Sequence, residues 1–175
     1  APNSKAPASL RTLLSVVVVD LIGFAIVVPI LPFYVTEFGA GGFELGLVVA
    51  SFAAMQFAAG PLWGRLSDRI GRRPVLLVTI AGNTLSMLAL GFADSLAAVF
   101  AARILSGAFA GNLGVATAYI ADATDEEERP RWMGLIGASF AVGFTLGPVI
   151  GGVTSIWGYS TPMFVAAGLS GANLL

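Results

Sequence analysis

The sequence has 175 residues, of which 57% are hydrophobic and 11% charged, and its formal net charge is −1 at pH 7. Soluble domains usually carry about 25% charged residues, so this composition excludes a disordered chain, a nucleic-acid-binding domain and an ordinary cytosolic enzyme. The 22 glycines are typical of helices packed in lipid, where small residues allow close approach. We therefore expect an all-α membrane protein that has the lipid bilayer as its first partner.

Two missing residue types limit the chemistry. The sequence has no cysteine and no histidine, so it can form no disulfide or thiolate site and lacks the commonest metal ligand. It also contains no phosphate-binding loop, metal-ligand cluster or nucleophile–base pair. We therefore predict that the protein is not an enzyme, holds no metal or cofactor and binds no nucleic acid. Any proton chemistry must use carboxylates.

Residues 1–12 are predicted to form a cytoplasmic segment, and residues 13–175 a single unit of transmembrane helices, each of which needs about 20 mostly apolar residues. Six spans are expected, at about 13–33, 44–64, 74–93, 96–120, 132–152 and 160–175. The first is too long for a signal peptide and contains Asp20. The last is short and stops at Leu175 without a basic flank, which suggests a chain that ends within a helix.

The basic residues indicate how these spans are oriented. Eight of the nine lie before the first span, between the second and third, or between the fourth and fifth. These eight are Lys5, Arg11, Arg65, Arg69, Arg72, Arg73, Arg129 and Arg131. The alternate connections contain none, so the positive-inside rule predicts a cytoplasmic N-terminus. The acidic run 125–128 is interpreted as a solvated turn before the fifth span.

Two charged residues, Asp20 and Arg103, lie inside predicted spans. Each is about eight residues from one end of its span, which is roughly 12 Å deep in a hydrocarbon core about 30 Å thick. A charge there costs at least about 2.5–3.5 kcal/mol and normally faces a partner or a wet cavity. Both a substrate or proton pathway and a structural ion pair are open interpretations. Uncharged polar residues that can line a cavity or bond between helices are Gln56, Asn83, Ser86, Asn112 and Thr117.

Four segments show defined spacing. The connection between the second and third spans is Gly64-Arg65-Leu66-Ser67-Asp68-Arg69-Ile70-Gly71-Arg72-Arg73-Pro74. A generic basic loop would explain its arginines, but not Asp68 four residues before Arg72. The other segments are Arg103 with Gly107, Gly143-Phe144-Thr145-Leu146-Gly147-Pro148-Val149-Ile150-Gly151-Gly152, and Asp20 followed by Pro29-Ile30-Leu31-Pro32. Gly-x-x-x-Gly alone is generic in membrane helices, but four segments in register are specific.

Together these segments resemble the major facilitator superfamily. The connection is similar to its G-x-L-a-D-R-x-G-R-R/K signature between helices two and three, and Arg103 with Gly107 to its fourth-helix R-x-x-x-G element. Residues 143–152 are similar to its antiporter element, G-x-x-x-G-P-x-x-G-G. The likeness is greatest to the drug/proton antiporter group, which includes tetracycline exporters. It implies the six-helix N-terminal half of a twelve-helix transporter, built from two three-helix repeats, in a bacterial inner membrane.

The resemblance implies proton-coupled export (antiport) of drugs or other amphiphilic small molecules by alternating access, driven by the proton gradient. The expected cavity and coupling residues are Asp20, Arg103, Gln56, Asn83 and Asn112. A change in the separation of Asp20 and Arg103 would drive proton uptake or release, because the protonation of a buried carboxylate responds to a nearby cation.

The signature connection is expected to act as a latch. Arg72 can reach Asp122 at the inner end of the fourth helix in a charge-assisted pair, and by resemblance Asp68 caps a helix of the opposite half. The other latch positions are Gly64, Arg69, Gly71 and Arg73, and these arginines can also be topological anchors only. In the fifth helix, a groove is expected at Gly143, Gly147, Pro148, Gly151 and Gly152. By resemblance the groove meets a helix of the other half and seals the outer side.

Alternatives remain for partner and substrate. Because six helices are half of such a transporter, the partner is either a C-terminal six-helix half or a second copy in a homodimer. Tetracycline exporters carry a third-helix carboxylate where this sequence has Ser86, which weakens the case for a metal–tetracycline substrate. A facilitator that exports a lysolipid, sugar or metabolite, and a non-transporting sensor or assembly partner of this fold, are the other interpretations.

Overall fold

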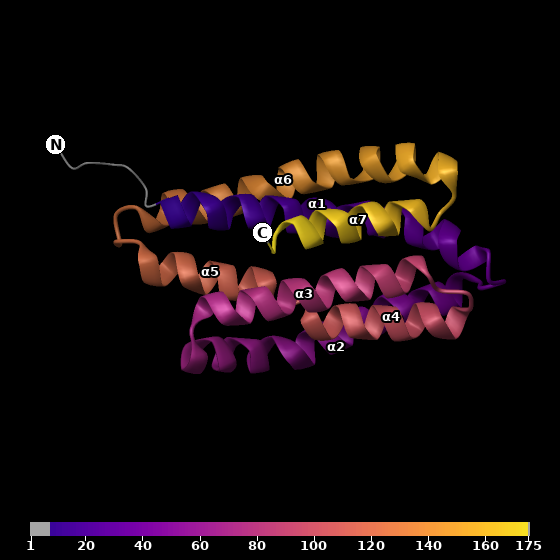
Figure 1. The fold of residues 1–175 in the computed structure, drawn as a ribbon, viewed down its shortest axis with the longest axis horizontal. Coiled ribbons are helices and arrows are strands. Elements are labelled where there is room, and N and C mark those ends of the chain that lie inside the picture. Colours follow the sequence, from indigo (N-terminus) through magenta and orange to yellow (C-terminus); the bar gives the residue numbers. More distant parts are fainter. Residues whose placement is uncertain (1–7, 175) are drawn as a thin grey trace.

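The computed structural model describes residues 8–174, which form helices joined by short connections (Figure 1). The helices are α1 (Ala8–Thr36), α2 (Gly42–Ile70), α3 (Arg72–Gly91), α4 (Leu96–Phe109), α5 (Asn112–Ala123), α6 (Arg129–Thr154), the short 3₁₀ helix η1 (Ser155–Trp157) and α7 (Thr161–Ala172). The described part of the chain is therefore all-α, as the composition predicts. Most of residues 1–12, including Lys5, lie outside the described residues, and so does Leu175.

Five stretches are long and apolar enough to cross a membrane. They are Leu10–Thr36, Gly42–Ile70, Arg72–Gly91, Leu96–Ala123 and Arg129–Trp157. They correspond to the first five predicted spans, with ends shifted by a few residues. The fourth is interrupted, because α4 ends at Phe109 and α5 begins at Asn112. The helix at the sixth predicted span, α7, has 12 residues, so its membrane crossing stays a prediction.

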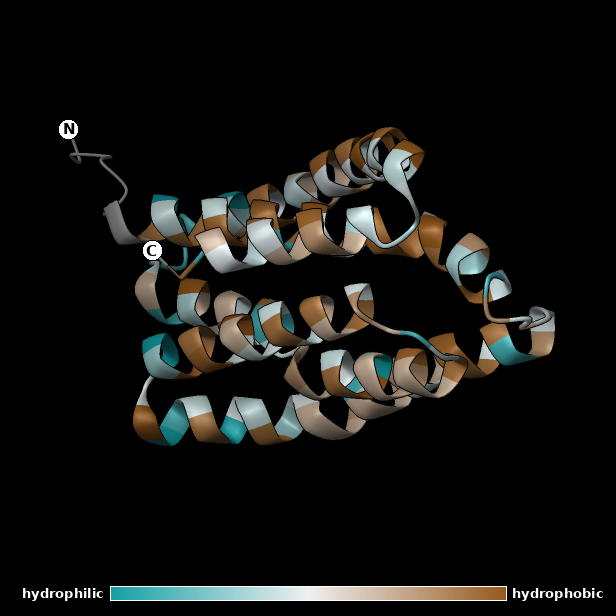
Figure 2. Cartoon of the chain, turned by 45° about the vertical axis from the view of Figure 1, so that its right-hand side comes forward, coloured by the Kyte–Doolittle hydropathy of each residue, from teal (hydrophilic) through white to brown (hydrophobic). Residues whose placement is uncertain are grey.

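The connections alternate between the two ends of the bundle. The α2–α3 and α5–α6 connections and the start of α1 lie at one end, and the α1–α2, α3–α4 and α6–α7 connections lie at the other (Figure 1). Apart from Arg103, the described arginines all belong to the first end. Hydrophilic residues gather at the ends of the bundle, chiefly where α2 joins α3 (Figure 2). We refer to the arginine-rich end as the cytoplasmic end, following the positive-inside prediction.

The core consists of two apolar clusters, one above the other along the bundle. The outer cluster includes Tyr34 and Met163, and the cytoplasmic cluster includes Val75 and Trp132. The Tyr34 hydroxyl is buried and donates to the carbonyl oxygens at the end of α3, 2.8 Å from that of Leu90. Polar residues of α3 and α5 fall between the two clusters along their helices, which places a polar layer at mid-depth in an otherwise apolar bundle.

The glycine groove of α6 packs on α1, not on another half of the molecule. Gly143, Gly147 and Gly151 are buried, and a Cβ at Gly151 would lie 2.9 Å from the carbonyl oxygen of Ile26. A Cβ at Gly147 would collide with Ala25. The expectation that this groove meets the other half is therefore wrong for these three positions, because the missing side chains bring two helices of the same half together. Pro148 and Gly152 lie on the exposed side of α6.

Candidate functional site

A cavity of about 260 Å³ opens at mid-depth between α1, α2, α3, α4, α5 and α6. Its lining combines one carboxylate with amides, a hydroxyl and aromatic rings. The lining residues are Asp20, Leu21, Phe24, Phe52, Gln56, Asn83, Met87, Ser106, Ala110, Asn112, Leu113 and Phe140. Four of the five predicted cavity residues are among them, whereas Arg103 is not. A small, largely apolar pocket with a few placed polar groups suits an amphiphilic ligand.

Two amide groups hold the carboxylate of Asp20. Its Oδ1 accepts a hydrogen bond from Nδ2 of Asn112 at 3.1 Å and a longer one from Nδ2 of Asn83 at 3.5 Å. Asn83 also accepts from Ser106 Oγ at 3.4 Å and donates to Ser170 Oγ at 3.4 Å. The three helices α1, α3 and α5 therefore meet at Asp20, and α7 is joined to them through Asn83.

The break between α4 and α5 positions Asn112 for this contact. A Cβ on Gly111 would lie 2.8 Å from the Trp63 ring, so only glycine allows this approach of α2. Trp63 Nε1 donates to the carbonyl oxygen of Ala108 at 2.6 Å, and Gln56 Nε2 reaches that of Ala110 at 3.5 Å. These side chains satisfy carbonyls that the interruption frees. The break also turns the N-terminus of α5, with its partial positive charge, toward the cavity.

The interruption was not predicted, although the sequence carries a signal for it. Residues 107–114 contain three glycines and an asparagine within a predicted span, and such residues weaken a helix interior. Two other sequence candidates lie outside the cavity. Ser86 and Thr117 donate to carbonyl oxygens of their own helices, those of Gly82 and Leu113, each at 2.7 Å. They therefore neither line the cavity nor bond between helices.

Arg103 is buried, with 3% of its surface exposed, and faces α2. Its Cζ lies 4.3 Å from the centroid of the Phe52 ring, and its Nε and Nη1 have no hydrogen-bond partner among the described residues. The described part of the chain contains no ion pair between Arg103 and Asp20. Asp20 bonds instead with α3 and α5, so the expected pairing of the two intramembrane charges is not formed. A desolvated cation–π contact is worth about 2 kcal/mol and partly offsets the burial of the cation.

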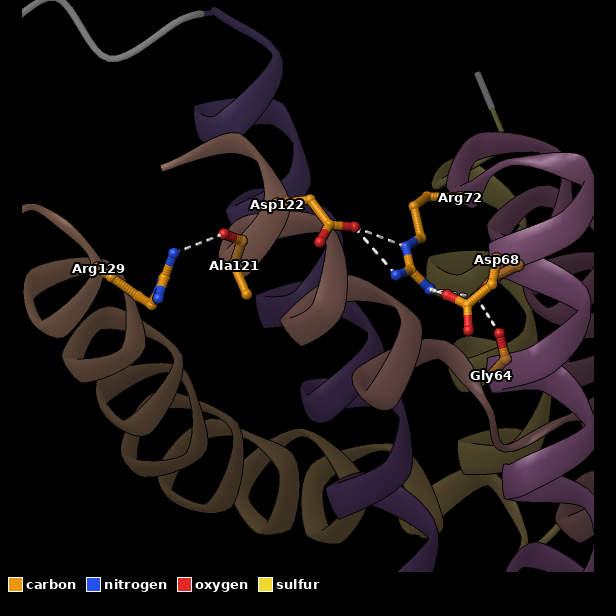
Figure 3. A network of polar contacts seen from close by, with 7 residues as sticks. Gly64, Asp68, Arg72, Ala121, Asp122 and Arg129 are labelled. Carbon is orange, nitrogen blue, oxygen red and sulfur yellow. Dashed lines mark hydrogen bonds and ion pairs between the residues drawn. The ribbon is translucent and has the colours of Figure 1, made fainter. Parts of the chain in front are cut away.

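At the cytoplasmic end, Arg72 joins two helices as predicted (Figure 3). Its Nη2 and Nε each lie 3.0 Å from Oδ2 of Asp122 at the end of α5. Its Nη1 lies 2.6 Å from Oδ1 of Asp68 and donates to Ser67 Oγ at 2.6 Å. The predicted contact between Arg72 and Asp122 is confirmed. One guanidinium therefore ties the end of α2 and the start of α3 to the inner end of the fourth span.

The remaining latch positions differ in backbone conformation, exposure and contacts. Gly71 has φ 97° and ψ 154° between α2 and α3, a backbone conformation that favours glycine. Gly64 has open space where a Cβ would lie. Arg69 and Arg73 are exposed and enter no ion pair in the part of the chain that the structure describes. The acidic residues 125–128 form an exposed turn before α6, as predicted.

A second arginine contact on α5 was missed by the sequence analysis. Arg129, at the start of α6, donates through Nη2 to the carbonyl oxygen of Ala121 at 3.2 Å (Figure 3). The same nitrogen also donates to the carbonyl oxygen of Thr124 at 3.4 Å. A cation at a helix C-terminus is favourable because the last carbonyls lack intrahelical partners. The cytoplasmic end of α5 is therefore held from two sides, by Arg72 through Asp122 and by Arg129 directly.

Comparisons with known proteins agree with this geometry. A family model described as Major Facilitator Superfamily matches residues 13–175. The chain is 38% identical over 174 residues to the class C tetracycline resistance protein of Escherichia coli, covering 98% of this chain and 44% of that protein. It is 33% identical over 159 residues to multidrug resistance protein 2 of Bacillus subtilis (strain 168), covering 90% of this chain and 40% of that protein.

A solved structure shares the fold. The crystal structure of the human organic anion transporter MFSD10 (TETRAN) superposes with a TM-score of 0.85 at 27% identity, covering 97% of this chain and 46% of that one. The chain thus spans less than half the length of the relatives it matches.

Proposed function

The chain belongs to the Major Facilitator Superfamily, and we propose that it forms part of a proton-coupled exporter of drugs or other amphiphilic small molecules. Its fold is that of the N-terminal half of such a transporter. Relatives named as tetracycline and multidrug resistance proteins support a drug exporter. Because the chain spans less than half of their length, transport is assigned to the complete protein, in a bacterial inner membrane.

The observation that carries this proposal is the cavity around Asp20. It offers one carboxylate, amide groups from Asn83 and Asn112, and an aromatic wall that includes Phe24 and Phe140. An intramembrane carboxylate is costly and is kept where it serves a substrate or an ion. A drug-like amphiphile can place its apolar part against the rings and its polar part at the amides and Asp20.

Asp20 is also the proposed proton carrier. The sequence has no histidine, and Asp20 is the only acidic residue among the described residues that line the cavity. Binding of a substrate at Asp20 would compete with binding of a proton there, and this competition is the simplest form of antiport. The amide donors Asn83 and Asn112 stabilise the carboxylate after the proton has left, since they bond to its charged form.

The latch at Arg72 is the proposed element that biases the conformational equilibrium. Its contacts with Asp68 and Asp122 hold the cytoplasmic ends of α2, α3 and α5 together. Alternating access requires one half to rock against the other around the central site. We propose that the network of Arg72 stabilises the arrangement that is closed toward the cytoplasm, and that its rearrangement accompanies opening.

The proposed partner is a C-terminal six-helix half, which would close the cavity. In the most apolar stretch of each span, only 17% of α2 and 22% of α6 is buried. The corresponding buried shares are 44% for α1 and 50% for α3. Side chains such as Phe57 on α2 and Val149 on α6 are exposed. A homodimer of this chain is the alternative occupant of the same two faces.

The third-span position Ser86 bears on the substrate. It is fully buried and bonded to its own helix, and the lining formed by residues 8–174 has no second carboxylate beside Asp20. A divalent cation usually needs several oxygen ligands. We therefore propose an amphiphile that binds without a metal ion, and a facilitator that exports a lysolipid, sugar or metabolite remains the second candidate.

Inverted membrane vesicles that contain the complete protein test this function. With an imposed proton gradient, they should accumulate ethidium or tetracycline, and a protonophore should abolish the accumulation. Asp20→Asn should remove gradient-driven accumulation, whereas Asp94→Asn, in the exposed connection between α3 and α4, should retain it. Accumulation by Asp20→Asn at the wild-type level would refute proton coupling through Asp20. No accumulation across a broad panel of substrates would favour a sensor of this fold.

A further inference from the structure

The buried guanidinium of Arg103 has an aromatic ring as its partner instead of an acceptor. Only 3% of Arg103 is exposed, and Nε and Nη1 have no hydrogen-bond partner among the described residues. Its Cζ lies 4.3 Å from the centroid of the Phe52 ring. A buried cation without an acceptor is unfavourable, so an accessible oxygen acceptor would compete with the ring for this guanidinium.

Phe52 separates this cation from the cavity. Phe52 lines the cavity, and Arg103 is not among the lining residues that the structure describes. The cavity contains Asp20, whose Oδ1 bonds only with the amides of Asn112 and Asn83 in the described part of the chain. The two intramembrane charges therefore lie on different helices with one ring at the boundary between Arg103 and the cavity.

The ring is held in this position by its own surroundings. Gly107, four residues after Arg103, leaves room for the Phe52 carbonyl oxygen, which a Cβ there would strike. On another side, the Phe24 ring of α1 packs on Phe52 with centroids 5.7 Å apart. The close packing of α2 on α4 and the contact between rings leave Phe52 little freedom to leave the guanidinium.

We propose that Phe52 is a positioning residue that shields the Arg103 guanidinium from the substrate cavity and thereby makes the cavity prefer cationic over anionic substrates. The preference for cationic substrates rests on the proposed transport function, whereas the shielding of Arg103 does not. With the ring in place, Asp20 is the only charged group that a substrate meets in the lining contributed by the described part of the chain. Without the ring, the guanidinium gains access to the cavity, where it attracts anions, repels cations and competes for Asp20.

Chemical labelling of Arg103 tests the shield without requiring transport. The complete protein in detergent is treated with the arginine reagent phenylglyoxal, and labelling of Arg103 is measured by peptide mass spectrometry. Phe52→Ala and Phe52→Leu should raise the labelling rate about thirtyfold, the factor that matches loss of a desolvated cation–π contact of about 2 kcal/mol. Phe52→Trp, which restores a π face, should keep it low. Phe140→Leu removes another ring from the cavity lining, one whose ring contact is with Phe144 and not with Phe52, and should not raise the labelling rate.

Transport of a cation and an anion tests whether the shield sets the charge preference of the cavity. The ratio of initial transport rates of ethidium, a cation, to fluorescein, an anion, should fall in Phe52→Leu and be restored in Phe52→Trp. In an Arg103→Gln background, Phe52→Leu should no longer change the ratio, because the cation that the ring shields is gone. Equal labelling of Arg103 with and without the ring, or an unchanged ratio in Phe52→Leu, would overturn the proposal. If the wild type labels as expected but transports neither dye, the proposed export function fails while the shield stands.

Discussion

The two intramembrane residues of opposite charge, Asp20 and Arg103, do not form an ion pair with each other in the described part of the chain. Asp20 bonds with Asn112 and Asn83, and Arg103 stacks on Phe52. Hydrogen bonds to a charged group contribute about 1.5–3 kcal/mol, so the amides replace a cation as the support of the carboxylate. An Asp20 without a permanent counter-ion is free to exchange a proton for a substrate, which a tight ion pair would oppose.

The latch gives a prediction at the level of one side chain. Arg72→Ala removes contacts to both Asp68 and Asp122. Because both carboxylates are 61% exposed, each pair contributes only about 0.2–1 kcal/mol. We therefore expect the initial rate of export by the complete protein to fall several-fold without loss of folded protein. Arg72→Lys should rescue only part, since an ammonium cannot offer both Nε and Nη2 to one carboxylate.

Arg131→Ala is the matched control for this prediction. Arg131 is exposed at the same end of the bundle and forms no ion pair within the described residues. Its removal changes the net charge by the same amount, so the export rate should stay near the wild-type value. Equal losses in Arg72→Ala and Arg131→Ala would mean that charge at this end matters and that the specific contacts of Arg72 do not.

At the scale of helices, close packing of α1 on α6 organises one side of the cavity. Both helices contribute lining residues, Asp20 and Phe24 from α1 and Phe140 from α6. Glycines at intervals of four residues remove the side chains that would separate their backbones. The antiporter-like pattern of the fifth span thus serves, in this structure, to fix the helix that carries Asp20.

Gly147→Val tests this packing. The new side chain would collide with Ala25 and reach within 2.9 Å of the Ile26 nitrogen. Overpacking of this kind costs about 1–3 kcal/mol, so the purified complete protein should unfold in detergent at a lower temperature than the wild type. Gly168→Val, on the exposed side of α7 where nothing lies within 4 Å of the added Cβ, should leave the unfolding temperature nearly unchanged. An equal or larger loss in Gly168→Val would show that the close packing of Gly147 on α1 is not what the substitution disturbs.

The helices also show what could be predicted from the sequence. The span positions and the contact of Arg72 with Asp122 follow from local features, which are long apolar runs and charges fixed at helix ends. The direction in which Arg103 faces and the helix on which Gly147 packs do not follow from local features. Both depend on how each helix is rotated about its axis. A helix that is apolar on all sides gives no periodic signal for that rotation. The interruption at Gly111 depends likewise on Trp63, which is distant in the sequence.

For the whole molecule, the exposed apolar faces of α2 and α6 are the expected interface with the C-terminal half. When the two halves are expressed as separate chains, we predict that they co-purify. Phe57→Asp, at a side chain that is 85% exposed on α2, should abolish co-purification, because the charge would be buried without a partner. Leu85→Asp, at a side chain that is 62% exposed on α3, should leave co-purification intact. Loss in both variants would indicate a general failure of membrane insertion, and retention in both would contradict the assignment of the interface.

We propose that substrate movement is exchanged for protons at Asp20. The most direct measurement follows the internal pH of liposomes that contain the complete protein, with a pH-sensitive dye, when ethidium or tetracycline is added without any imposed gradient. The wild type should show a substrate-dependent proton movement opposite in direction to the substrate, and Asp20→Asn should show none. Substrate transport by the wild type without any proton movement would show that protons are not exchanged for substrate at Asp20.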